Sequence, residues 1–86
     1  MKEIVLTQNQ VALVDDEDYE RLNEFKWYAR KDRSKFYAAR MSPLIDGERQ
    51  EIRMHHEIIG VSPEGREIDH RNGDGLRNTR KNLRFV

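Results

Sequence analysis

The chain has 86 residues, of which 36% are hydrophobic and 37% charged, and its formal net charge is zero. This length suits one small domain, and its seven aromatic residues are more than a disordered chain would carry. The absence of cysteine excludes a disulfide framework and a thiolate zinc site, and no apolar run is long enough to span a membrane.

The first predicted elements are a β-hairpin and a helix. Two apolar runs, residues 3–7 and 11–14, have the length of strands and lie close enough to pair. Four consecutive acidic residues then begin a helix over 16–24, with Asp15 or Asp16 as its cap, because negative charge suits the positive end of the helix dipole. Successive residues on a helix point in different directions, so we expect these acids to face water rather than to bind a metal.

The middle of the chain predicts a three-stranded antiparallel sheet. Its strands cover residues 25–31, 35–41 and 49–54, with turns at 32–34 and 46–47. Basic and apolar positions alternate along these strands, which places one face on the core and the other in solvent.

Four large side chains are expected in the core next to this sheet. Helical spacing places Tyr19, Leu22 and Phe25 on the inward face of the first helix. Trp27 follows them, and a single large aromatic residue between strands usually anchors a small fold.

The sheet resembles the small three-stranded DNA-binding module of plant ethylene-response factors. The residues that carry this resemblance are Trp27-Tyr28-Ala29-Arg30 and Phe36-Tyr37-Ala38-Ala39-Arg40. Five basic residues of this sheet are within reach of phosphates or groove edges, namely Arg30, Lys31, Arg33, Lys35 and Arg40. An ordinary solvated sheet face stays open as an alternative, because charged residues on exposed strands are common.

A short helix and a loop lead to the most informative stretch. The helix is predicted over 54–60 and ends at Gly60, with Ile58 and Ile59 facing inward. Residues 61–65 form the loop that follows.

Asp69 and His70 are where the chemistry is expected. They stand side by side before an Asn-Gly-Asp-Gly turn at 72–75, and residues 82–86 form a returning strand. A carboxylate can hold a hard divalent cation, and an imidazole that titrates near neutral pH can take a proton from water. Residues 66–86 hold six basic and three acidic side chains, which gives this stretch the local positive charge that a polyanionic substrate requires.

This stretch resembles the HNH endonucleases, in particular the small phage and intron-type homing nucleases. The residues that carry the resemblance are Met54-His55-His56-Glu57-Ile58-Ile59, Ile68-Asp69-His70-Arg71-Asn72-Gly73 and Leu76-Arg77-Asn78-Thr79-Arg80-Lys81-Asn82-Leu83-Arg84. The resemblance implies that Asp69 is a metal ligand and His70 the general base, while Asn82 orders the loop and orients the histidine. Arg77 stands where the family usually has Asp.

The resemblance also implies a cofactor and a partner. The cofactor is Mg²⁺ or Mn²⁺, with Zn²⁺ less favoured, because adjacent His55 and His56 diverge by about 100° on a helix and at most one can share a metal with His70. His55 is expected to pack beside the site. The partner is double-stranded DNA, contacted by Arg71, Arg77, Arg80, Lys81 and Arg84, and from the sheet by Arg40 and Arg30.

We therefore expect an α+β chain in two portions. Residues 1–53 form a small antiparallel sheet with short helices, and residues 54–86 form an HNH-type ββα-metal hairpin whose final helix would lie beyond Val86. A DNA endonuclease, a DNA-binding module without catalysis and a small assembly domain are the three functions left open. The unfinished motif predicts a homodimer, and the resemblance predicts the cytoplasm of a bacterial or phage-infected cell.

Overall fold

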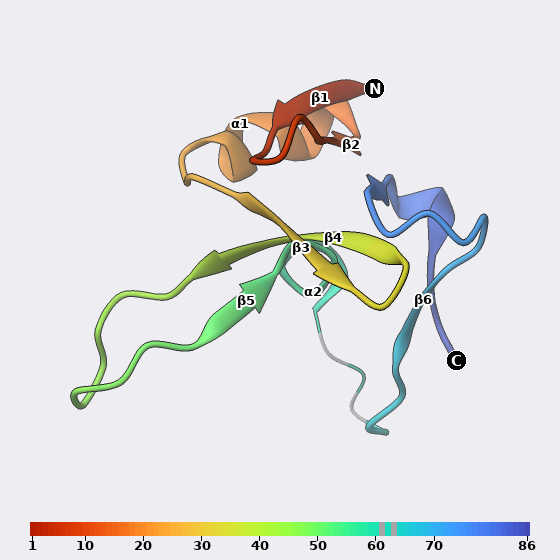
Figure 1. Cartoon of the computed structure of the whole chain (residues 1–86). Helices are drawn as coiled ribbons and strands as arrows, with labels where there is room; N and C mark the ends of the chain where they lie inside the picture. The colour runs from red at the N-terminus through yellow and green to blue at the C-terminus, as the bar shows by residue number, and fades with distance from the viewer. Residues whose placement is uncertain (61, 63) are drawn as a thin grey trace.

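The computed structural model describes residues 1–60, 62 and 64–86, and it has the expected α+β class, with small, mostly antiparallel sheets and two short helices (Figure 1). The elements are β1 (Lys2–Val5), β2 (Val11–Val14), α1 (Asp16–Asn23), β3 (Tyr28–Asp32), β4 (Lys35–Met41), β5 (Glu51–Arg53), α2 (Met54–Ile59), β6 (Ile68–His70), β7 (Arg77–Asn78), the 3-10 turn η1 (Arg80–Asn82) and β8 (Leu83–Phe85). Of the predicted loop 61–65, Val61 and Pro63 lie outside the described residues. No helix within the described ranges is long and apolar enough to cross a membrane.

The amino-terminal hairpin forms as predicted, and it gains a third strand from the far end of the chain. β1 pairs antiparallel with β2, and two residues of the connecting turn adopt positive φ, which suits the twist of a hairpin. β2 also pairs in parallel with β7, with Leu13 opposite Arg77 and Val14 opposite Asn78. This pairing joins the two portions that were predicted to meet between residues 53 and 54.

One hydrophobic core serves both portions. Its buried members are Ile4, Leu6, Ala12, Val14, Leu22, Trp27, Ala29, Ala38, Met54, Ile58 and Leu83. The predicted burial of Leu22, Trp27 and Ile58 is confirmed. The Trp27 indole N–H donates to the Leu22 carbonyl oxygen over 2.8 Å, so the polar end of this core residue is satisfied.

Phe25 does not join this core, contrary to the prediction. α1 ends at Asn23, so Phe25 lies beyond the helix and is 41% exposed. Its ring stacks instead on Arg40, whose guanidinium carbon lies 3.8 Å from the ring centroid. Arg40 is buried and pairs with Glu57 of α2 over 3.0 Å. This arginine therefore ties β4 to α2 and to the segment after α1.

The acidic start of α1 is held by ion pairs. Asp15 precedes the helix as predicted, but its side chain makes no capping bond, and Oδ2 accepts from the Arg80 backbone N–H over 2.9 Å. Asp16 pairs with the amino terminus. Asp18 is 2% exposed and accepts from Arg80 and Arg21 at distances between 2.8 and 3.0 Å. The expectation that these acids face water is therefore wrong for Asp18, because two arginines offset the cost of burying its charge.

The second sheet has the order β3-β4-β5, with shorter outer strands than predicted. Residues 42–50, between β4 and β5, form an arm that projects from the body of the molecule (Figure 1). Asp46 and Gly47 at its tip both adopt positive φ, as the predicted turn requires. Leu44 and Ile45 are exposed on this arm.

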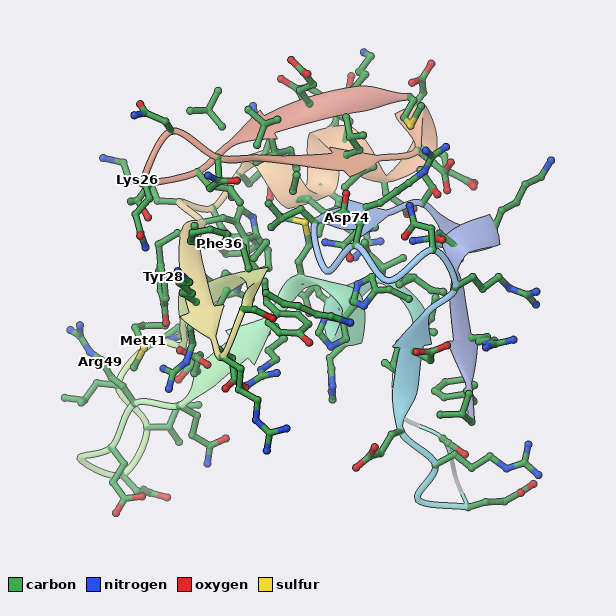
Figure 2. The ribbon with its side chains drawn as sticks, turned by 45° about the vertical axis from the view of Figure 1, so that its right-hand side comes forward. Lys26, Tyr28, Phe36, Met41, Arg49 and Asp74 are labelled. Atoms are coloured by element: carbon green, nitrogen blue, oxygen red, sulfur yellow. The ribbon has the colours of Figure 1, made fainter. Side chains whose placement is uncertain are left out.

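Gly75 lets the loop before β7 lie directly on β4. A Cβ at this position would overlap the Phe36 carbonyl oxygen and would lie 2.8 Å from Cδ1 of Tyr37. Figure 2 shows Asp74, the preceding residue, on the loop that runs beneath the amino-terminal strands. The close approach at Gly75 therefore fixes how the carboxyl-terminal segment packs on the second sheet.

Replacing Gly75 with alanine should lower the free energy of unfolding by about 2–3 kcal/mol, because the new methyl group meets backbone that cannot rotate away. Gly47→Ala is the control without a close approach, because a Cβ at Gly47 would meet no heavy atom within 4 Å. Its φ of +78° alone carries a strain of about 1 kcal/mol for alanine. Urea denaturation measures both variants. Equal losses would contradict the role of the close approach.

Replacing Asp18 with asparagine should destabilise the fold by about 2 kcal/mol, because two arginines lose a charged acceptor. The hydrogen bond from Arg80 holds the pKa of the Asp18 carboxyl below its usual value, so this contribution is present near neutral pH and is lost as the pH falls through that lowered pKa. Urea denaturation at neutral and acid pH checks both statements. Asp16→Asn, which alters an exposed pair, should have little effect.

Candidate functional site

Asp69 and His70 lie on β6, which pairs antiparallel with β8. Asp69 is opposite Arg84 and His70 is opposite Leu83 in this ribbon. Because successive side chains of a strand point to opposite faces, Asp69 lies on the open side, with its side chain 41% exposed, and His70 lies on the buried side. The ribbon therefore offers a carboxylate to solvent and holds the imidazole in a fixed environment.

The Asp69 carboxylate is held at one oxygen and open at the other. Arg84 contacts Oδ2 through Nε at 3.0 Å and through Nη2 at 2.9 Å. Oδ1 has no hydrogen-bond partner among the described residues. Hydrated Mg²⁺ or Mn²⁺ accepts hard oxygen ligands and takes few of them from the protein, so Asp69 Oδ1 fits such an ion as a single ligand. Arg84 would then fix the orientation of that ligand from behind.

His70 is hydrogen-bonded to an asparagine that sequence reasoning did not single out. Its Nε2 lies 2.8 Å from Oδ1 of Asn78, which is fully buried on β7. Within the described part of the chain, Nδ1 of His70 has no protein partner and is not among the buried unpartnered atoms. The imidazole is therefore anchored at one nitrogen and open at the other.

Asn82 orders the loop, but it does not orient His70, contrary to what the resemblance implied. Its Oδ1 accepts from the Asn72 backbone N–H over 3.0 Å, and its Nδ2 donates to Asn72 Oδ1 and to the Arg77 carbonyl. Asn72 and Asp74 then bond backbone N–H groups two residues further on. Asn82 therefore closes the turn from the inside, and the contact with the histidine comes from Asn78.

His55 packs beside His70 as a neutral imidazole. It is 4% exposed, and its ring centroid lies 4.9 Å from that of His70 in an edge-to-face arrangement. Tyr37 lies 6.0 Å from both rings. Burial, followed by the charges of His70, His56 and Arg53, lowers the pKa of His55 to about 3. Its Nδ1 is buried and has no hydrogen-bond partner among the residues that the structure describes.

A cavity of about 380 Å³ adjoins His55. Its lining comes from the second sheet, α2 and the start of β6, namely Tyr37, Arg53, His55, His56, Arg66, Glu67 and Ile68. The Arg53 guanidinium lies 5.2 Å from the Tyr37 ring centroid within it. The cavity thus brings the sheet, which was predicted to contact DNA, next to the histidines.

The predicted DNA-contacting cations divide into paired and unpaired groups. Arg30, Arg40, Arg80 and Arg84 pair with Glu51, Glu57, Asp18 and Asp69, respectively. In the ranges that the structure describes, Arg71, Arg77 and Lys81 make no ion pair, and Arg71 and Lys81 are exposed. Local charge counting could not separate the two groups, because their partners are distant in sequence.

One acidic group elsewhere has the spacing of metal ligands. Oxygens of Asp15, Glu17 and Asp18 lie within 4.8 Å of one another, the one such grouping of three among the described residues. Arg80 contacts all three of these acids. The cluster therefore works as an ion-pair network that joins α1 to η1.

A scan against protein-family models finds no match, and neither a search of curated proteins nor one of solved structures finds a similar protein. The resemblance to HNH nucleases therefore depends on the motif itself. The roles of the metal, DNA and a homodimer stay predictions.

The buried His55 should make the fold sensitive to acid. Its imidazole takes a proton near pH 6.5 in the unfolded chain and only near pH 3 in the folded one, so acid favours unfolding between these values. The free energy of unfolding should fall by about 1 kcal/mol per pH unit in this range. His55→Gln should flatten this slope in urea denaturations at several pH values, and the exposed His56→Gln should change it less. Parallel slopes for the parent and His55→Gln would contradict this assignment.

Proposed function

We propose that this chain is a metal-dependent DNA endonuclease domain of the HNH type. One arrangement supports it best: His70 is anchored through Nε2 with Nδ1 open, and the neighbouring Asp69 is anchored through Oδ2 with Oδ1 open. A base with a free nitrogen and a carboxylate with a free oxygen, carried by consecutive residues of one strand, are the two groups that metal-assisted phosphodiester hydrolysis requires.

The proposed reaction assigns one task to each side chain. His70 Nδ1 takes the proton of the attacking water while Nε2 keeps its bond to Asn78. Asp69 Oδ1 holds the divalent ion, and Arg84 keeps that carboxylate in place. Mg²⁺ or Mn²⁺, when bound, stabilises charge on the scissile phosphate. Arg71, exposed directly after His70, offsets further charge on the phosphate oxygens.

Double-stranded DNA is the proposed substrate because cations without an acidic partner lie in the same segment as the site. Arg71 follows His70 directly, whereas Arg77 and Lys81 line a separate cavity next to the acidic start of α1. Arg71, Arg77 and Lys81 make no ion pair among the described residues, so they are available to phosphates. Arg30 is the cross-strand partner of Tyr37 and so shares a sheet face with it, next to the histidines. Arg40 is less suited to the predicted DNA contact, because its charge is used internally by Glu57 and Phe25.

A DNA-binding module without catalysis is the second candidate function. It is favoured by the ion pair that occupies one side of Asp69, and by the low exposure of His70, which is 8%. In that case the cations bind DNA and the Asp-His pair serves only the fold.

A plasmid assay separates the two candidates. With Mg²⁺ or Mn²⁺ the chain should nick supercoiled plasmid, and EDTA should abolish the reaction. His70→Ala should lower the rate by about 10²-fold or more and spare binding in a gel shift, since a general base contributes about that much.

Asp69→Asn should likewise abolish the metal-dependent reaction. Asp46→Asn is its matched control, because the same chemical change falls on the tip of the arm, away from the site. Binding without cleavage under every metal condition would favour the second candidate. A His70→Ala variant that still cleaves plasmid would contradict the assignment of His70 as the general base.

A further inference from the structure

The hydrogen bond between Asn78 and His70 joins a fully buried side chain to a nearly buried one. Asn78 is 0% exposed and His70 is 8% exposed, and the 2.8 Å contact joins the amide oxygen to Nε2. A buried amide is costly unless it is bonded, and the Asn78 nitrogen has no partner within the described ranges. Asn78 therefore makes its side-chain bond to His70 alone, at some expense to stability.

The backbone around Asn78 is held by its pairing with β2. Asn78 pairs with Val14 in the parallel β7–β2 ladder, and the Leu13 backbone N–H donates to the Leu76 carbonyl over 2.8 Å. Thr79, the next residue, is buried as well. The amide can therefore act as a rigid reference for the imidazole, because its strand cannot shift without breaking the first sheet.

An amide oxygen is only an acceptor, so the ring nitrogen that faces it must carry a hydrogen. A neutral imidazole has one such N–H, and with it at Nε2 the lone pair lies at Nδ1. Nδ1 is the nitrogen that lacks a protein partner among the described residues. The geometry thus selects the one tautomer in which the open nitrogen can accept a proton.

We propose that Asn78 is a positioning residue that holds neutral His70 in its Nε2–H tautomer and so presents Nδ1 as the base. The role of Nδ1 as the base rests on the proposed function. The selection of the Nε2–H tautomer by Asn78 does not depend on it. The motif suggested Asn82 for this task. The Asn82 side chain is instead hydrogen-bonded to Asn72 and to the Arg77 carbonyl, and it contacts neither ring nitrogen of His70.

The test reads the tautomer directly, with no need for cleavage. In ¹⁵N spectra of the full chain at pH 8.5, where an ordinary imidazole is neutral, His70 should show a protonated Nε2 and an unprotonated Nδ1. The His70 signals are those that disappear in His70→Gln. Asn78→Leu, which keeps the approximate shape and removes the acceptor, should give a mixture of both tautomers. Asn78→Asp, which restores an acceptor, should return the Nε2–H form.

Val14→Ala is the control for a purely structural role of Asn78. If Asn78 only supported the β7–β2 ladder, loosening that ladder at Val14 would change the His70 tautomer as well. Val14 is fully buried opposite Asn78 on β2 and is not a partner of His70, so its truncation loosens the same ladder and leaves the amide in place. Its spectrum should keep the parental tautomer. A parental His70 with the hydrogen on Nδ1, as a reversed amide would impose, overturns the proposal. An Asn78→Leu spectrum identical to the parental one does so equally.

Cleavage rates extend the test if the chain is active. Asn78→Leu should lower kcat by about 10- to 100-fold and leave KM within about twofold, as expected for a group that orients another. Asn78→Asp should recover most of the loss, and Val14→Ala should keep parental kcat at a temperature where it is folded. If the parent does not cut, the proposed function fails, whereas the tautomer spectra still decide the role of Asn78.

Discussion

Two residues near the carboxyl end, Arg77 and Asn78, complete a sheet that begins at the second residue of the chain, and the site depends on this pairing. The β7–β2 ladder fixes the backbone of Asn78, Asn78 fixes the ring of His70, and the turn closed by Asn82 connects β6 to β7. Asp18 adds a second tie, because its ion pair with Arg80 holds η1 against α1. Each contact is modest alone, but all of them restrain the same loop.

Local patterns in the sequence predicted the elements that local physics determines. The hairpin at the start, the helix after the acidic run, the Asp46-Gly47 turn and the helix ended by Gly60 are all present, because their signals are periodicity, charge and backbone preference within a few residues. A strand of two residues such as β7 carries no periodicity, so its pairing with β2 could not be predicted. Phe25 was misplaced because it continues the helical spacing of Tyr19 and Leu22 past the end of the helix, and its partner Arg40 lies on another strand.

For the candidate site, the sequence indicated the Asp-His pair but not the residues that contact it. The sequence singled out Asp69 and His70 as candidates, because a carboxylate next to an imidazole in a basic stretch is a common arrangement at functional sites, and their role stays a prediction. It could not assign the contact to Asn78 rather than Asn82, since both are asparagines in the same motif and only packing distinguishes them. The basic residues had the same difficulty: charge is visible in a sequence, but the acid that neutralises it, such as Asp18 for Arg80, is defined by the fold.

The parallel ladder between β2 and β7 also has a consequence for biosynthesis. It pairs residues 13–14 with residues 77–78. Joining segments so far apart in the chain has a high entropy cost, so this contact is expected to form late in folding, after the intervening chain is in place. During synthesis the amino-terminal hairpin leaves the ribosome long before its third strand exists. A chain that has not yet reached β7 therefore holds neither the buried amide nor the ordered imidazole, and the contact between Asn78 and His70 forms only after these residues have been made.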